Sequence, residues 1–312
     1  MVELIRYEKK HEKDWNNLID ISKNGTFLLN RSYMDYHSDR FVDFSLLIYR
    51  KQKLIAVFPA NINDNVIYSH QGLTYGGLIY INKLSAVDVL SIFENIIRYY
   101  KNNNIETIIY KAIPYIYSSY PSQEDLYALF RNNAKLIACN ISSTIPLSKK
   151  IKFIESRKSG VRKANNNNLF YEQSNDLDAF WNILNANLGT KYDVKPVHFV
   201  AEIRHLQNLF PNHIKLYLVK KQDETLAGAV LFLNKNTVRV QYISATPEGK
   251  ELGALDLLFD YLINKAYSNF EYFDFGQSTE QMGNYLNENL LFQKEGFGGR
   301  GVVYNIYEIK LQ

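Results

Sequence analysis

Residues 214–245, with the sequence IKLYLVKKQDETLAGAVLFLNKNTVRVQYISA, decide the fold class that we expect for this chain. They hold three strand-like runs, Ile214–Val219, Leu226–Leu233 and Val238–Ala245. The polar turn 220–224 joins the first two runs. Asn234-Lys235-Asn236 joins the last two and is typical of a tight hairpin. The stretch therefore predicts three consecutive strands of one sheet.

Helical patterns surround these strands. Two helices are predicted before them, over Asp176–Leu188 and Val197–Leu209. After them comes a helix with its apolar face formed by Leu255, Leu258, Phe259, Leu262 and Ala266. A strand over Tyr272–Phe275 follows. The predicted order is α-α-β-β-β-α-β.

The first half of the chain repeats this order. Trp15 and Leu18 lie in a predicted opening helix, and a short second helix is expected near Tyr33–His37. The later elements are strands over Phe44–Tyr49, Leu54–Asn61 and Val66–Ser69, a helix with Val89, Phe93, Ile96 and Tyr100 on one face, and a strand over Ile105–Tyr110.

The two tryptophans of the chain support a duplication. Trp15 and Trp181 occupy the same place in each half, 166 residues apart. A similar order of elements can also arise by chance in α/β proteins, but the shared element order, the turn placement and the nearly constant offset favour a repeat. We expect domains over 1–146 and 147–312, because Pro146 begins a polar, basic connection.

Composition narrows the class of protein. The chain has 312 residues, of which 46% are hydrophobic and 22% charged, as in globular proteins with a core. A net charge of +4 gives little support to an RNA-binding role alone. Cys139, the single cysteine, excludes an intrachain disulfide, and we expect a buried thiol there. No signal peptide or membrane span is recognised, which predicts a cytoplasmic protein, with contact at the inner membrane face left open.

The repeated order resembles that of the GNAT acyltransferase fold. Two such halves in tandem resemble the Fem-type (FemAB-like) aminoacyltransferases, which build peptidoglycan cross-bridges. The resemblance implies an α/β (α+β) protein with two GNAT-like domains, each a mixed central sheet flanked by helices. It also implies that the second domain carries the main site.

A basic helix is expected to open the second domain, as in these relatives. It covers residues 156–164 and contains Arg157, Arg162 and Lys163. The planar guanidinium group binds phosphate oxygens in pairs, so these side chains are candidates to bind a phosphate on the donor or on a lipid-linked acceptor. The alternative is a solvated helix face.

The segment Phe273-Asp274-Phe275-Gly276-Gln277-Ser278 resembles a motif of the same group, in which an arginine stands where this chain has Gln277. Asp274 would emerge near the end of a central strand, where open α/β sheets bind ligands. Gln277 and Ser278 would then contact substrate. The alternative is that Asp274 only caps the following loop.

Residues 292–301 resemble the group's phenylalanine-lysine-x-x-aromatic-glycine signature, with one extra residue before the lysine. Lys294 is the matching lysine and would contact donor or acceptor, with Arg300 beside it. Phe292 and Phe297 are expected to be buried, which argues against a loose loop. Shorter resemblances to a bacterial branch lie in Lys195-Pro196-Val197-His198 and in Tyr75-Gly76-Gly77-Leu78, and Tyr75 is a further candidate for substrate binding.

The acyl donor stays open between acyl-CoA and aminoacyl-tRNA. GNAT enzymes bind the coenzyme A pyrophosphate on a loop at a helix N-terminus, and the matching residues here are Lys250, Gly253 and Ala254. Leu255 departs from the pattern, and Glu248 and Glu251 would repel a pyrophosphate. No metal is expected.

An amine acceptor must lose a proton before it attacks a carbonyl. His198 is the best histidine candidate for the base, although a lone histidine is more often structural. On the third strand, Arg239 and Gln241 should share one face and Tyr242 and Ser244 the other; either pair would line the cleft.

The predicted function is transfer of an acyl group, acetyl or aminoacyl, to an amine. The acceptor would be an amino sugar or a peptide of a cell-envelope precursor, as a small molecule or linked to lipid, with tRNA as a candidate donor and peripheral membrane contact open. Catalysis would come mainly from positioning. The alternative is a non-catalytic binding protein built from decayed GNAT-like domains.

Overall fold

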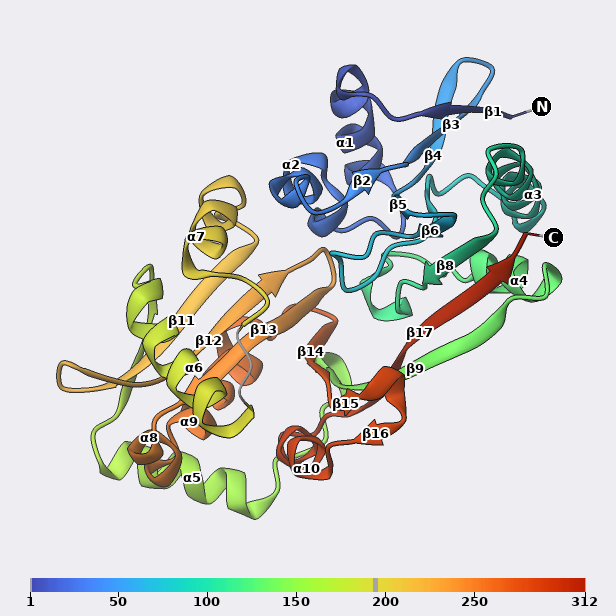
Figure 1. The fold of residues 1–312 in the computed structure, drawn as a ribbon. Coiled ribbons are helices and arrows are strands. Elements are labelled where there is room, and N and C mark those ends of the chain that lie inside the picture. Colours follow the sequence, from blue (N-terminus) through green and yellow to red (C-terminus); the bar gives the residue numbers. More distant parts are fainter. Residues whose placement is uncertain (1, 193–195, 312) are drawn as a thin grey trace. The chain divides into compact units, whose positions relative to one another are not determined.

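The computed structural model describes residues 2–192 and 196–311 (Figure 1). Internal contacts divide the chain into two compact units. The first unit comprises Met1–Asn140, Thr279–Tyr285 and Val303–Gln312, and the second comprises Ile141–Ser278 and Leu286–Val302. Among the described residues, none of the helices combines the length and the apolar character that crossing a membrane requires.

We predicted a domain boundary at residue 146, and this boundary stays a prediction. The two compact units are each made of more than one segment of the chain. The last strand, β17 (Arg300–Lys310), begins in the second unit and ends in the first. Its residues Ile306–Lys310 pair antiparallel with β8 (Thr107–Lys111). Backbone pairing therefore assigns the C-terminal residues to the first unit, which the order of elements does not reveal.

The described residues of the first unit contribute strands to two larger sheets. One has the order β1 (Glu3–Arg6), β3 (Leu46–Arg50), β4 (Lys53–Phe58), β7 (Ile79–Tyr80). In the other, β17 is followed by β8, β6 (Val66–Tyr68), β5 (Asn61–Asn63) and β2 (Val42–Asp43). The predicted strand Leu54–Asn61 is thus split between the sheets at Pro59, which has no N–H to donate to a ladder.

The helices of the first unit are α1 (Glu12–Ile21), α2 (Arg31–Met34), α3 (Ala86–Asn102) and α4 (Glu124–Arg131). The apolar face predicted for α3 is confirmed, since Val89, Phe93 and Ile96 are buried. They pack in one core with β4 and β8.

The second unit is built on strands in the order β10 (Phe170–Ser174), β11 (Ile214–Lys221), β12 (Glu224–Leu233), β13 (Thr237–Ala245), β14 (Tyr272–Gln277) and β9 (Lys135–Pro146). Neighbours run antiparallel except β13 and β14, which are parallel. The three strands predicted from residues 214–245 are therefore confirmed.

Helices cover both faces of this sheet. Figure 1 shows α6 (Leu177–Tyr192) and α7 (Val200–Leu209) on one side of β11–β13, and α5 (Glu155–Asn166), α8 (Pro247–Leu252) and α9 (Ala254–Tyr261) on the other. A π-helical turn, Leu262–Ala266, extends α9, and α10 (Glu288–Gly296) follows β14. The side chains on the α9 face form one apolar core cluster of the unit.

The tryptophans confirm the correspondence between the halves in structural terms. Trp15 of α1 donates its indole N–H to the carbonyl of Leu29, two residues before α2. Trp181 of α6 donates to the carbonyl of His198, two residues before α7. In each unit the indole N–H therefore fixes the chain that leads into the second helix.

One prediction about the core is wrong. The Cys139 thiol was expected to be buried, but the residue is exposed. It lies on β9 next to the buried Ala138, and consecutive side chains of a strand point to opposite faces. The apolar run 136–139 does not show which of these faces is covered.

Candidate functional site

The site is organised by the point at which two parallel strands separate. β13 and β14 pair from Thr237↔Tyr272 to Arg239↔Asp274, and the register ends there. A bulge in β13, opposite Val230 and Leu231 of β12, follows at once. The edge of residues 240–245 that faces away from β12 therefore has no β14 partner, and a gap opens beside it.

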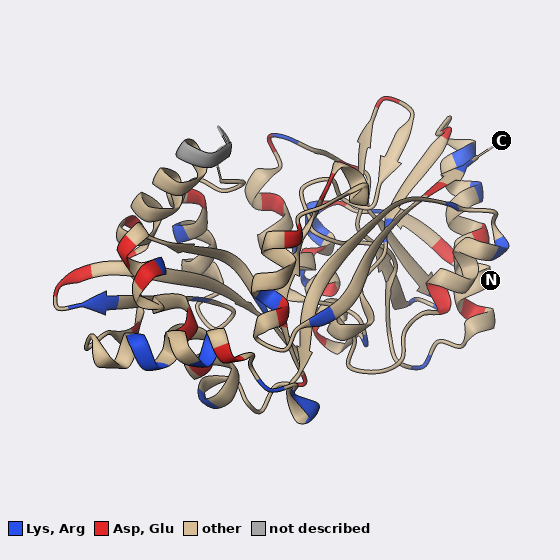
Figure 2. Ribbon diagram, turned by 90° about the horizontal axis from the view of Figure 1, so that it is seen from below, with Lys and Arg blue, Asp and Glu red and all other residues tan. Residues whose placement is uncertain are grey.

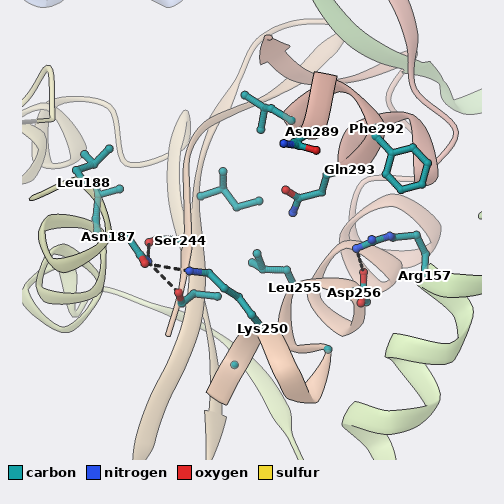
Figure 3. A pocket seen from close by; sticks show the side chains of 16 residues that line it. Arg157, Asn187, Leu188, Ser244, Lys250, Leu255, Asp256, Asn289, Phe292 and Gln293 are labelled. Atoms are coloured by element: carbon teal, nitrogen blue, oxygen red, sulfur yellow. Dashed lines mark hydrogen bonds and ion pairs between the residues drawn. The ribbon is translucent and has the colours of Figure 1, made fainter. Parts of the chain in front are cut away.

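A pocket of about 480 Å³ occupies this part of the second unit (Figure 3). Its walls come from β13, α6, α5, the α8–α9 turn and α10. The lining residues discussed below include Leu184, Asn187, Ser244, Lys250, Asp256 and Gln293. The lining mixes apolar and polar groups, as is common in small-molecule sites.

One wall carries a chain of hydrogen bonds. Asn187 of α6 donates from Nδ2 to Ser244 Oγ at 2.7 Å and to the Ala245 carbonyl at 2.8 Å. Its Oδ1 accepts from Lys250 Nζ at 3.0 Å. Figure 3 shows these three residues aligned along one side of the pocket. Asn187 therefore connects α6, the end of β13 and the cation on α8.

An ion pair forms the opposite wall. Arg157 Nη1 lies 2.8 Å from Asp256 Oδ1, and the guanidinium carbon lies 5.4 Å from the centre of the Phe297 ring. Burial raises the pKa of Asp256, and Arg157 opposes this. Arg157 Nε is buried and has no hydrogen-bond partner among the described residues. The guanidinium is thus oriented but retains donor capacity beside the pocket.

Two glycines bring this wall together. Gly253, between α8 and α9, has a φ of +78°, and a Cβ there would lie 2.4 Å from the Gly160 carbonyl oxygen. A Cβ on Gly160 of α5 would lie 1.9 Å from Asp256 Oδ2. Helices α5 and α9 therefore approach closely only because both positions lack side chains. This approach places Arg157 next to Asp256.

A buried polar cluster lies where β14 leaves β13. Asp274 is fully buried and accepts hydrogen bonds from Ser142 Oγ and, at 2.9 Å, from Thr144 Oγ1. It also accepts from the Gly276 N–H at 3.3 Å, as the loop-capping interpretation predicts. Arg239 Nη1 lies 3.8 Å from its other oxygen. With these partners, Asp274 fixes three strands rather than presenting a carboxylate to the pocket.

Lys294 of α10 is the second centre of this cluster. Its Nζ donates to the carbonyls of Gly276 at 2.8 Å and Gln277 at 2.7 Å, and it lies 2.9 Å from Ser278 Oγ. The residue is only 6% exposed. The lysine therefore ties α10 to the end of β14.

Burial lowers the pKa of Lys294 to about 7, with Asp274 opposing this shift and Arg239 adding to it. The three partners satisfy either protonation state. The ammonium donates three hydrogen bonds, whereas the neutral amine donates two to the carbonyls and accepts one from the Ser278 hydroxyl. Lys294 can thus change its charge near neutral pH without losing a partner.

His198 and Tyr242 form a separate pair. The His198 ring Nδ1 and backbone N–H both hydrogen-bond the Tyr242 hydroxyl. Burial raises the pKa of Tyr242 to about 12. His198 is 5% exposed and does not line the pocket, so its predicted role as base stays a prediction. Lys195 of the same motif lies outside the described residues.

A bulge at Gln241 changes the two predicted faces of β13. Arg239, Tyr242 and Ser244 pair with Phe232, Val230 and Gly228, which are alternate residues of β12, so these three side chains share one face. Of the three, Ser244 lines the pocket, whereas Arg239 lies beside Asp274. The predicted pairing of Arg239 with Gln241 on one face assumed a regular strand.

Several predicted site residues lie elsewhere. Arg162 and Lys163 are exposed on α5 and pair with Glu155 and Glu251. Arg300 is exposed and donates to the Gly299 carbonyl. Tyr75 is fully buried in the first unit, where its hydroxyl donates to Thr26. Of the three basic residues predicted to bind phosphate on the helix that opens the second domain, only Arg157 lines the pocket.

The loop predicted to bind the acyl donor lies at the pocket. Lys250 and Gly253 line the pocket, and Ala254 is buried beside them. Glu248 pairs with Lys221 instead of facing the pocket, and the carboxylate that lines it is Asp256. Phe297 is buried as predicted. The burial predicted for Phe292 is wrong, because it is 63% exposed at the pocket rim.

Sequence reasoning missed Asn187, Asp256 and the pocket face of α10. Asn187 follows Leu184 by three residues, which places both on one face of α6. That spacing shows that they are neighbours but not that they face β13.

Residues 157–285 match the model of the acetyltransferase (GNAT) domain family. The chain carries a GNAT domain. Its enzyme class is therefore acyltransferase, and its GNAT domain contains the pocket wall from Arg157 to Asp256. No curated protein matches the chain.

Solved structures share the GNAT-like tandem fold over almost the whole chain. FemX has a TM-score of 0.70 at 12% identity, covering 99% of this chain and 97% of that one. The C-terminal domain of a putative lysylphosphatidylglycerol synthetase from Agrobacterium fabrum has a TM-score of 0.63 at 10% identity, with coverage of 97% and 92%. A tandem GNAT protein from the clavulanic acid biosynthesis pathway has a TM-score of 0.51 at 8% identity, covering 100% and 99%. These likenesses establish the Fem-like tandem architecture.

Proposed function

We propose that the second unit transfers an aminoacyl group to an amine, with the end of the donor bound in the pocket beside β13. The amine nitrogen attacks the acyl carbon, a C–N bond forms, and the C–O bond to the donor ribose breaks. The proton lost by the amine passes to the leaving ribose oxygen, directly or through water. The observation that carries this proposal is the separation of β13 from β14 next to a 480 Å³ pocket.

Backbone groups would supply the main chemical assistance. Beyond Arg239, β13 has an edge without a β14 partner, and alternate N–H groups of a strand point to that edge. An N–H group there would donate to the carbonyl oxygen as negative charge develops on it. Arg157 and Lys250 would hold donor phosphates from the two walls.

The electrostatics of the pocket favour aminoacyl-tRNA over acyl-CoA. GNAT enzymes bind the pyrophosphate at a helix N-terminus, and here the first turn of α9 carries Asp256. The likeness to FemX and to a lysylphosphatidylglycerol synthetase supports the same choice. An amine of an amino sugar or a peptide of a cell-envelope precursor would be the acceptor, free or lipid-linked.

Acetyl transfer from acetyl-CoA is the second candidate. The observation in its favour is the match of residues 157–285 to the acetyltransferase domain family. Arg157 and Lys250 would then face the pyrophosphate, with the thiolate as leaving group.

Donor binding to a blocked pocket tests the proposal. Gln293→Trp would fill the pocket from α10, and Glu288→Trp is the matched control because Glu288 is exposed on the same helix outside the pocket. Binding of charged tRNA, uncharged tRNA and acetyl-CoA would be measured by titration. We expect the preference for charged over uncharged tRNA to be lost in Gln293→Trp and kept in Glu288→Trp. Equal binding by both variants would contradict the pocket assignment, and selective binding of acetyl-CoA would favour the second candidate.

A further inference from the structure

A basic segment, residues 149–163, carries more positive charge than the whole chain. It contains seven lysines and arginines and one glutamate, a net charge of +6, whereas the chain has +4. The rest of the chain therefore carries a net charge of −2. The segment runs along the second unit into α5, and Figure 2 shows the basic positions recurring along that helix. The modest net charge of the chain thus conceals one strongly cationic surface.

Some of the basic side chains in this segment pair with other residues of the chain, and others do not. Arg157 pairs with Asp256, Arg162 pairs with Glu155, and Lys150 donates to Asn264. Three further exposed lysines have side chains that make no hydrogen bond or ion pair with any described residue: Lys149, Lys152 and Lys158. Their charges are available to an external partner.

Aliphatic side chains are interleaved with these lysines. Ile151 is 45% exposed and Ile154 is 38% exposed. Beside them is a hollow of about 320 Å³, lined by Lys150, Ile151, Lys152, Phe153 and Lys158, with Asp260 and Asn264 at its other side. Two partly exposed isoleucines therefore lie among unpaired lysines on one short segment.

We propose that this basic segment docks the protein on an anionic phospholipid bilayer. Ile151 and Ile154 would enter the interface, while Lys149, Lys152 and Lys158 would contact headgroup phosphates. In the hollow, the two unpaired lysines outnumber the single carboxylate of Asp260, so a phosphate is favoured there.

The residue types favour a bilayer over RNA. Single-stranded and looped RNA is bound by arginine pairing and aromatic stacking, whereas the unpaired cations here are all lysines and the exposed apolar residues are aliphatic. Basic and apolar side chains on one surface are the combination that binds membrane interfaces. This inference does not depend on the identity of the acyl donor.

Flotation with vesicles tests the proposal. Vesicles of phosphatidylglycerol mixed with phosphatidylcholine would be compared with pure phosphatidylcholine vesicles. The test variant is Lys149→Gln/Lys152→Gln/Lys158→Gln, and the control is Lys51→Gln/Lys83→Gln/Lys135→Gln, which removes three exposed lysines of the first unit. We expect the test variant to bind anionic vesicles roughly 10- to 100-fold more weakly than the control, since each lysine near such a surface contributes about 1 kcal/mol.

A second variant separates lipid from RNA. Ile151→Ser should weaken vesicle binding and leave binding to bulk tRNA unchanged. The proposal is overturned if the native protein does not bind anionic vesicles, or if the test and control triples bind them equally. It is also overturned if the test triple loses tRNA binding and keeps vesicle binding, which would assign the surface to RNA. Arg157 and the pocket are untouched in every variant, so donor binding reports separately on the proposed function.

Discussion

At the scale of single residues, Lys294 is the position whose chemistry is most sensitive to its surroundings. It contacts two carbonyls and a hydroxyl at the end of β14, and its ammonium is almost fully desolvated. It does not line the pocket. We therefore regard Lys294 as a positioning residue, which orients β14 and α10 rather than touching the reacting atoms.

The lowered pKa of Lys294 predicts a pH dependence of stability. The unfolded chain binds a proton at this lysine up to its ordinary pKa of 10.5, whereas the folded chain releases it near pH 7. Between these values the unfolded state holds more protons, so the free energy of unfolding should rise with pH. From pH 7 to pH 9 the contribution is on the order of 2 kcal/mol.

Chemical denaturation of the native protein and of Lys294→Met at several pH values would measure this contribution. Lys265→Met, at an exposed lysine, is the control. The difference in unfolding free energy between the native protein and Lys294→Met should grow with pH, and the control should show no such trend. Parallel pH profiles for the native protein and Lys294→Met would contradict the assignment.

Asn187 gives a second prediction at this scale. Asn187→Ala removes the amide that joins Ser244, the Ala245 carbonyl and Lys250. Because the amide is partly exposed, the loss of stability should stay within about 1–2 kcal/mol. Donor affinity should fall about tenfold as Lys250 loses its orientation, as measured by titration with charged tRNA. An unchanged donor affinity would show that the wall formed by Asn187, Ser244 and Lys250 does not bind the donor.

At the scale of elements, the crossing of α5 and α9 determines the geometry of the pocket wall. Gly253→Ala would place a side chain at positive φ and against the Gly160 carbonyl. We expect a loss of about 1–3 kcal/mol in unfolding free energy and weaker donor binding, because Arg157 and Asp256 would separate.

Gly189→Ala is the matched control for this change. A Cβ at Gly189 in α6 would meet nothing within 4 Å, so alanine should stabilise that helix by up to about 1 kcal/mol. Thermal unfolding would measure both variants. If Gly253→Ala were as stable as the native protein, the close crossing would not be required.

The order of elements was predictable because periodicity and turn chemistry are local. The three strands from Ile214 to Ala245 and the helices before them are found where the pattern placed them. The helix over Pro247–Leu252 was missed, although Thr246 followed by Pro247 is a start signal: the Thr246 side chain accepts from the Gly249 N–H, with proline in the first turn.

The site was predictable only in part, since it depends on contacts between distant residues. Lys250 and Gly253 were found from a loop pattern, but Asn187 reaches the pocket only through the packing of α6 on β13. The bulge at Gln241 could not be read from sequence either, because its effect is to break the alternation from which faces are assigned.

At the scale of the whole molecule, duplication gives two units with separate cores. From Val303 onward the last strand belongs to the first unit, where Ile309 is 2% exposed and pairs with Ile108 of β8. We predict that Ile309→Ala destabilises the first unit by about 2–4 kcal/mol.

Hydrogen exchange would locate this effect. Protection should fall in β8 and remain unchanged in β11 and β12 of the second unit. Val303→Ala, at an exposed position of the same strand, is the control and should alter neither. Loss of protection confined to the second unit would contradict the assignment of residues 303–312.

The measurement that most directly tests the central claim is the transfer of a labelled aminoacyl group to an amine, followed by mass spectrometry of the acceptor. Native protein and Glu288→Trp should form an amide product with charged tRNA as donor, and Gln293→Trp should form it at a rate at least about tenfold lower. Amide formation by Gln293→Trp at the rate of Glu288→Trp would place the chemistry outside the pocket beside β13. Binding of donors without any amide product, across amino-sugar and peptide amines, would contradict the claim of transfer itself.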